Sequence, residues 1–508
     1  MPALPHSVWL NVARYLPALL LRDLYAVNHS FFEIAMDCRY RQLIFAYMDL
    51  RMVKNLVRLR DPAVAKRVQI LHVYPGFLPD PNGAPSLFDQ GKPECPVQKR
   101  SFLTLLLDIA NTFLEQRNSL SRHPKYRMME ALRKPEDVVQ ILADVLAGLP
   151  NVSDYYVTWH GLPAIASSPA PFVVSPLRPN LRKLSLNLSL ENVQSLLSPD
   201  SDISRLEEFH LCIHSESVYD EHERSYVLQN HLAPAISRFQ STLKTLVISS
   251  WEPTDLSPLF QNIDCIPNLD DLSINIPVES CHLGDPAGLN AFLQKHQNSL
   301  RCLRLRASQY GGQGIMPASL TSLYDWICKA TDSVELPKLR ALDTASSLFH
   351  IEASLLCVQR FSRTLTSLSI TGVYQSYDCV AETLTHLSNS PAGEEPLKLR
   401  LGPVLLSPQL VDLIAARIPN LHQLELLVRK IVPIDADAAS SPTNNSRSSK
   451  SKQIDGFIFA MESRRYPTWR LHQLSLVTDI LPDRDHYEAA LGKAFFGSIP
   501  HCTVLPSD

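Results

Sequence analysis

A short pattern recurs along the chain, with an apolar residue at its first, fourth and sixth positions. Neighbouring copies start about 25 residues apart or further, which is the period expected when each copy belongs to one repeating unit. Some copies follow a Pro-Asn pair, as at 179–180. The clear copies are LRKLSL (181–186), LEEFHL (206–211), LKTLVI (243–248), LDDLSI (269–274), LRCLRL (300–305), LTSLSI (365–370), LHQLEL (421–426) and LHQLSL (471–476).

This pattern constrains the fold because a short strand directs the fourth and sixth residues to one side, and the preceding turn places the first residue in the same core. Segments of helical character lie between the copies, several with proline near the first helical position. We therefore expect an α/β solenoid, with parallel strands on the concave side and helices on the convex side. The helical segments are 225–240, 286–297, 317–332, 350–363, 407–418 and 484–496.

The pattern and its period resemble those of leucine-rich repeats. Regular repeats of that kind carry an asparagine eight residues after the first leucine. This chain instead has Ser189, His214 and Trp251 at such positions. We therefore expect an irregular leucine-rich-repeat solenoid.

Composition argues against several functional classes. Among 508 residues, 48 are Lys or Arg and 51 are Asp or Glu, for a net charge of -3, so no positive excess is available to bind nucleic acid. No apolar run approaches the roughly 18 residues that span a bilayer, and the N-terminus lacks the basic region of an export signal. The ten cysteines are scattered without a CxxC pair, as is typical of free thiols in a reducing compartment. We expect a soluble cytoplasmic or nuclear protein that binds neither nucleic acid nor membrane.

The N-terminal segment predicts three short helices, at Ser7–Leu16, at Ala18–Val27 and from about Ser30, which forms a capping-box pattern with Glu33. Their apolar residues occupy more than one face. A bundle this small hides only a modest fraction of its surface. Either a partner covers the remainder, or the helices cap the open end of the solenoid. The two arrangements are compatible.

LPHSVWLNVARYLP (4–17) followed by LLLRDLYAVNHSFF (19–32) resembles the F-box, a three-helix adaptor. An N-terminal F-box followed by irregular leucine-rich repeats is similar to substrate receptors of Skp–cullin–F-box ubiquitin ligases, including divergent fungal ones. The resemblance implies binding to a Skp-type linker subunit and a cullin, while the repeats hold an unidentified protein substrate. The chain departs from the pattern at His6 and Phe32. The implied linker-binding residues are Leu4, Pro5, Val8, Val12, Leu16, Pro17, Leu20, Leu24, Val27 and Phe31.

The chain is accordingly divided into four parts. Residues 1–45 are the F-box, 46–75 are linker helices and a first repeat, 76–149 are an insertion with a Pro-rich loop and then helices, and 150–508 are the solenoid. Within the solenoid, the Ser-rich segment 435–453 is predicted to be disordered. Loop tips tolerate such insertions, although a phosphorylation or targeting switch is an alternative.

No residue pattern predicts catalysis. The GGxG at 311–314 lacks the strand and the Lys-Ser/Thr partner of a nucleotide-binding loop. The pairs Cys281-His282 and His501-Cys502 lack the spacing of metal ligands. We expect a non-catalytic protein without metal or cofactor. The alternative to a ubiquitin-ligase receptor is a leucine-rich-repeat interaction scaffold unrelated to ubiquitin.

The candidate target-binding surface consists of the strand positions that alternate with the buried leucines. These positions carry charges of both signs, and exposed charges are most often merely solvated. Two basic spots could receive an acidic or phosphorylated segment, and two tryptophans could either anchor a partner or cover the core. The candidates are Tyr156, Trp159, Trp251, Arg304, Arg306, Lys398 and Arg400.

Overall fold

The chain divides into two compact units, Met1–Leu243 and Lys244–Asp508, and each is described by itself. Both units alternate strands with helices, and their strands pair in sequence order. The computed structural model describes residues 5–17, 20–21, 24–47, 49–74, 135–159, 171–197, 203–214, 220–250, 254–277, 284–308, 320–345, 350–388, 397–433, 447–478, 484–499 and 502–505.

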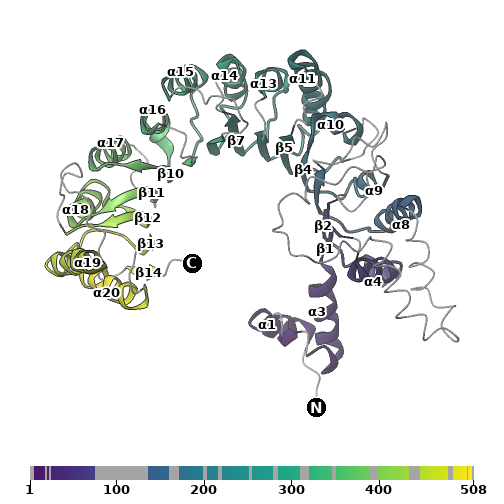
Figure 1. The fold of residues 1–508 in the computed structure, drawn as a ribbon, viewed down its shortest axis with the longest axis horizontal. Helices are drawn as coiled ribbons and strands as arrows, with labels where there is room; N and C mark the ends of the chain where they lie inside the picture. Colours follow the sequence, from purple (N-terminus) through teal and green to yellow (C-terminus); the bar gives the residue numbers. More distant parts are fainter. Residues whose placement is uncertain are drawn as a thin grey trace, which may run out of the picture. The chain divides into compact units, whose positions relative to one another are not determined.

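The first unit contains a parallel sheet in which each described strand pairs with the next one along the chain. Its strands are β1 (Gln42–Phe45), β2 (Ile70–Val73), β3 (Asp154–Trp159), β4 (Lys183–Ser189) and β5 (Glu208–His214). Its helices are α1 (His6–Arg14), η1 (Leu24–Ala26), α3 (His29–Tyr40), α4 (Leu50–Arg58), α5 (Pro62–Ala65), α8 (Pro135–Ala147), α9 (Pro171–Val174), α10 (Leu190–Leu196), α11 (Glu221–Val227), η4 (Leu228–Leu232) and α12 (Ala233–Ser237). Helices α4, α8, α9 and α10 lie on one side of the sheet, whereas α1 and α3 lie beyond β1 (Figure 1).

The second unit repeats this organisation. Its strands are β6 (Thr245–Ser250), β7 (Asp271–Pro277), β8 (Cys302–Ser308), β9 (Ala341–Ala345), β10 (Ser367–Gln375), β11 (Leu397–Leu406), β12 (Leu421–Ile431), β13 (Gln473–Val477) and β14 (Thr503–Leu505). Its helices are α13 (Ser257–Asn262), α14 (Pro286–Lys295), α15 (Leu320–Ala330), α16 (Ile351–Phe361), η5 (Ser362–Thr364), α17 (Tyr377–Ser388), α18 (Pro408–Arg417), α19 (Arg447–Glu462) and α20 (Arg484–Ser498). Within this unit the helices follow the outer side of an arc, and the strands follow its inner side (Figure 1).

The core is built from the leucine positions of the recurring pattern. In β3 and β4, buried and half-buried residues alternate strictly over the first six positions. The parallel register places Tyr155, Leu184 and Phe209 in one row across three strands, and all three are fully buried. Since each row continues from strand to strand, neighbouring repeats cover one another's apolar face. The predicted α/β organisation of parallel strands and alternating helices is confirmed.

Several elements differ from the sequence-based expectation. Strand β1 and strand β14 were not predicted, because each is a short segment without the full pattern. Helices α13 and α17 were also missed.

Helix α19 begins at Arg447, so the prediction of disorder across 435–453 is wrong from that residue onward. Ile454, Phe457 and Met461 anchor α19 in the core, and a Ser- and Lys-rich first turn does not prevent a helix anchored in this way from forming. Residues 434–446 lie outside the described part, as does most of the predicted insertion at 76–149, of which the structure describes 135–149.

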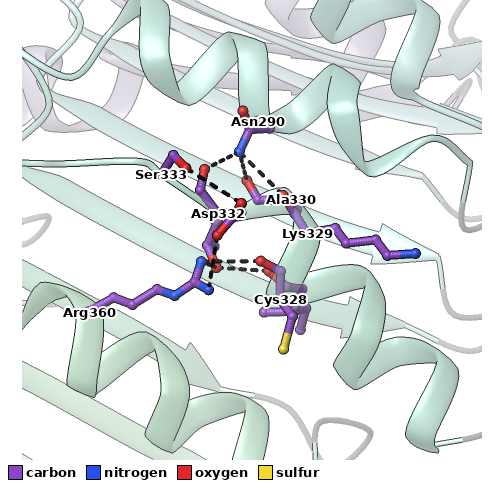
Figure 2. Close-up of polar contacts among 9 residues, drawn as sticks. Asn290, Cys328, Lys329, Ala330, Asp332, Ser333 and Arg360 are labelled. Carbon is purple, nitrogen blue, oxygen red and sulfur yellow. Dashed lines mark hydrogen bonds and ion pairs between the residues drawn. The ribbon is translucent and has the colours of Figure 1, made fainter.

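Side chains from neighbouring repeats bind the carbonyl groups at the carboxyl end of α15, where helices leave carbonyls without intrahelical partners. Asn290 of α14 donates from Nδ2 to the carbonyl oxygen of Asp332 at 2.6 Å. Arg360 of α16 donates to the carbonyl oxygen of Cys328 at 3.1 Å and to Oγ1 of Thr331 at 2.8 Å. Figure 2 shows both side chains converging on this helix end from opposite sides. The helix end is therefore held by the repeat before it and by the repeat after it.

The same device recurs elsewhere in each unit. Lys295 of α14 donates from Nζ to the carbonyl oxygens of Gln261 and Ile263 at the end of α13, at 3.0 Å and 2.9 Å. In the first unit, Arg238 donates to the carbonyl oxygen of Leu197 after α10, at 2.9 Å. A cation is favourable at a helix carboxyl end because the helix dipole is negative there.

We expect Arg360→Ala to lower the free energy of unfolding by about 1–3 kcal/mol, since it leaves the Cys328 carbonyl and the Thr331 hydroxyl without their charged donor. Arg417→Ala is the matched control, because Arg417 is exposed in the last turn of α18, and it should change stability by less than about 0.5 kcal/mol. Urea unfolding of the full chain measures both. Equal effects of the two substitutions would show that the contacts in Figure 2 contribute nothing beyond a surface arginine.

His296 is a buried titratable group that joins two repeats. Its Nδ1 lies 2.7 Å from the carbonyl oxygen of Phe292, and its Nε2 accepts a hydrogen bond from the backbone N–H of Ile266 at 2.9 Å. The ring is therefore held neutral with the proton on Nδ1. Burial lowers the pKa of His296 below its ordinary value of 6.5, and the neighbouring charge of Lys295 acts in the same direction.

Because the folded-state pKa is lowered, the stabilising contribution of His296 is fully present above about pH 6.5 and decreases as the pH falls toward the folded-state pKa. We expect the stability difference between wild type and His296→Gln to shrink as the pH falls from 7.5 to 5, by at most about 1.4 kcal/mol per pH unit. Chemical denaturation across that range measures the difference. A difference that does not vary with pH would contradict a neutral His296 in the folded state.

Candidate binding surfaces

The N-terminal helices form a small core of their own. Ala13, Leu21, Phe31 and Ile34 are buried together, with Trp9, Leu16 and Leu24 packed against them. The rings of Trp9 and Phe31 lie 5.0 Å apart between their centroids. Of the residues predicted to bind a linker subunit, Phe31, Leu16 and Leu24 therefore belong to this internal core.

Other predicted linker-binding residues remain exposed. Val8 and Val12 of α1 are 39% and 40% exposed, Leu20 is 49% exposed and Val27 is 62% exposed. Pro5 and Pro17 are also exposed, whereas Leu4 lies outside the described residues. Leu10 of α1, Tyr15 directly after α1 and Phe32 of α3 are also exposed. Val8 and Val12 lie one turn apart on the same face of α1, and exposed apolar side chains on one face are typical of a surface that binds a protein.

Helix α3 is fixed to the beginning of the first sheet. Arg67, which follows α5, donates to the Glu33 carboxylate at 2.5 Å, to the Asp37 carboxylate and to the backbone carbonyl of Glu33. The hydrogen bond from Arg67 holds the pKa of Glu33 below its ordinary value. The N-terminal cap of α3 is Asn28, whose side chain accepts from the N–H of Phe31 at 2.8 Å. The predicted capping box at Ser30 is therefore wrong, because Ser30 lies inside the helix.

On the strand surface of the first unit, aromatic rings stack across neighbouring strands. Tyr156 lies parallel to His72, with 4.3 Å between ring centroids and an interplanar angle of 6°. Lys183 lies 5.9 Å from the Tyr156 ring centroid and pairs with Glu208 at 2.8 Å. The predicted surface residue Tyr156 is thus half-buried by its neighbours but still faces outward.

Trp159 lies in the core, being only 2% exposed. Tyr155, Val157 and Trp159 occupy the inward positions of β3, whereas Tyr156 occupies an outward position. The side-chain period of a strand is two, so the indole must point to the same side as Tyr155. Of the two interpretations of Trp159, the structure therefore supports the one in which it covers the core. Trp251 lies outside the described residues.

In the second unit, neighbouring carboxylates neutralise one of the two predicted basic spots. Arg304 of β8 pairs with Asp271 of β7 at 2.8 Å. Arg306 of β8 pairs with Asp343 of β9 at 3.5 Å. Since β7 to β9 contain no other charged side chains, this part of the strand surface carries no net charge.

The second predicted basic spot keeps its positive charge. Arg400 of β11 pairs with Glu425 of β12 at 2.9 Å, whereas Lys398 is exposed and pairs with no described carboxylate. Sequence analysis missed Tyr374, Arg429 and Lys430, which continue this surface toward the carboxyl ends of β10 and β12. The sequence feature that could have revealed them is the apolar run that continues past Leu426, because it extends β12.

Among the described residues, no group of three or more His, Cys, Asp or Glu side chains is arranged to bind a metal ion. Within those same residues, every helix is too short or too polar to cross a membrane. No protein-family model matches the sequence, and no curated protein is significantly similar to it.

Proposed function

We propose that this protein is a non-catalytic substrate receptor of a Skp–cullin–F-box ubiquitin ligase in the cytoplasm or nucleus. In this proposal the N-terminal helices are an F-box that docks on a Skp-type linker subunit. The following units are irregular leucine-rich repeats that hold a target protein. The proposal rests on the sequence resemblance at 4–32 and on one structural observation, the exposed apolar side chains of the N-terminal helices.

The two sets of apolar residues in these helices support docking. One set closes a small core around Phe31, so the helices do not need a partner to pack against one another. The other set includes Val8, Val12 and Val27, which remain 39%, 40% and 62% exposed. Burying such side chains in a partner would contribute roughly 25 cal/mol per Å² of apolar surface.

The link between α3 and the first sheet fits an adaptor role. A ubiquitin-ligase receptor contributes by holding a target near another subunit's active site, so its effect depends on proximity and orientation. The contacts of Arg67 with Glu33 and Asp37 join the helix that would carry the linker subunit to the start of the first sheet. A flexible connection would fix that orientation less well.

The same contacts favour one alternative, a repeat scaffold unrelated to ubiquitin whose N-terminal helices only cap the first sheet. Terminal repeats need such a cap because their apolar face has no neighbour. A cap gives no reason for exposed valines at 8, 12 and 27, since a terminal cap usually presents a polar outer face to solvent. The two functions differ in whether a linker subunit binds.

The test is copurification of the full chain with a purified Skp-type linker subunit and a cullin. We expect wild type to retain both and Val8→Asp/Val12→Asp to lose at least about nine-tenths of them, because two desolvated charges would lie in the interface. Both valines are already partly exposed, so the substitutions leave the Phe31 core in place.

The matched control is Phe459→Asp/Phe496→Asp, which places two carboxylates at exposed apolar positions of α19 and α20. This control should bind the linker subunit as wild type does. The proposal fails if wild type does not bind the linker subunit, or if both double variants bind equally well while circular dichroism shows them folded.

A further inference from the structure

The positive charge on the strand surface of the second unit is concentrated on two adjacent strands. Strand β11 carries Lys398 and Arg400, and β12 carries Arg429 and Lys430, against a single carboxylate, Glu425. Strands β10 to β12 therefore carry four cations and one anion, a local charge of +3 in a chain whose net charge is -3. Strands β6, β13 and β14 carry no charged residue, and the charges of β7 to β9 cancel.

The side chains of this surface are available for binding. Lys398, Arg400, Arg429 and Lys430 are all exposed. Only Arg400 pairs with a described carboxylate. The guanidinium of Arg429 lies over the ring of Tyr374, 5.5 Å from its centroid. Stacking of this kind orients an arginine while leaving its N–H groups free for a carboxylate.

An apolar strip separates the two pairs of cations. Pro403 and Leu405 of β11 and Leu427 of β12 are half-buried. Pro403 and Leu427 lie between Lys398 and Arg400 at one end and Arg429 and Lys430 at the other, and Leu405 lies beside Lys430 in the strand register. The two strands approach closely here, because a Cβ added at Gly402 would lie 2.5 Å from the carbonyl oxygen of Leu427. Figure 1 places β10, β11 and β12 side by side on the inner side of the arc, with α17 and α18 on the outer side.

We propose that the strand surface of β10 to β12, here called the β10–β12 surface, binds an acidic protein segment. Carboxylates on either side of a short apolar stretch would meet Lys398 and Arg400 at one end and Arg429 and Lys430 at the other. The apolar stretch would lie on Pro403 and Leu427, next to Leu405. As a description of the target, this inference rests on the proposed receptor function. The binding itself is measured without any linker subunit, so its result does not depend on whether a linker subunit docks.

Two observations favour an acidic protein segment over nucleic acid. First, Glu425 lies within the surface and pairs with Arg400, and a fixed carboxylate repels a continuous row of phosphates. Second, the apolar strip matches aliphatic side chains, whereas binding to a nucleic-acid backbone depends on a continuous set of cations that neutralises many phosphates. An acidic segment with central leucines would pair with the cations at both ends of the surface and pack on the apolar strip in the middle.

The probe is a fluorescein-labelled peptide with the sequence Glu-Glu-Glu-Leu-Leu-Glu-Glu-Glu, titrated with the full-length protein and followed by fluorescence anisotropy. We expect saturable binding that weakens as salt is raised, since exposed charges are screened. Lys398→Glu/Lys430→Glu should weaken binding by about tenfold or more, because it replaces two attractions by two repulsions. Both lysines are exposed, so the substitutions leave the core intact.

Lys338→Glu/Lys452→Glu is the matched control, because it makes the same change in net charge at two exposed lysines outside the strands. It should change binding by less than about twofold. A peptide with lysine in place of every glutamate should not bind. The inference is overturned if the acidic peptide does not bind at millimolar concentration, or if both double variants weaken it equally. It is also overturned if a single-stranded oligonucleotide displaces the peptide and binds more tightly.

Discussion

The rest of the structure depends on the fact that one repeat cannot cover its own leucines. A strand such as β4 buries Leu184, Leu186 and Leu188 on one side, and only the neighbouring rows and the helices on that side keep water from them. The carbonyl groups at the end of α15 likewise depend on neighbouring repeats, because Asn290 and Arg360 supply their hydrogen-bond donors. Each repeat therefore completes both the apolar and the hydrogen-bonding requirements of its neighbour.

At the N-terminal end of the first unit, the contacts that packing requires can be compared with the apolar side chains that remain exposed. The residues around Phe31 form a closed core, and Arg67 fixes α3 to the first sheet, so the local requirements for stability are met. Val8, Val12 and Val27 remain exposed nevertheless. Exposed apolar side chains on a segment that is already packed are better explained by binding than by folding, which is the physical basis of the proposed adaptor function.

Sequence predicted the strands that carry the full apolar pattern, because the leucine spacing directly encodes which side of a strand is buried. It missed β1, which has only two inward residues, Leu43 and Phe45. It left Trp159 undecided, although strand alternation places that residue inward with Tyr155. Contacts such as Arg67 with Glu33, or Arg429 with Tyr374, join residues far apart in sequence. No local pattern encodes them, and they decide which predicted surface residues are neutralised and which remain available.

The most direct test of the adaptor account is amide hydrogen exchange of the full chain, alone and with a purified Skp-type linker subunit. The account predicts that backbone amides of α1 and of residues 24–27 exchange more slowly when the linker subunit is present, whereas amides of β4 and β10 do not change. Protection confined to the repeats, or no protection anywhere in the chain, would contradict it.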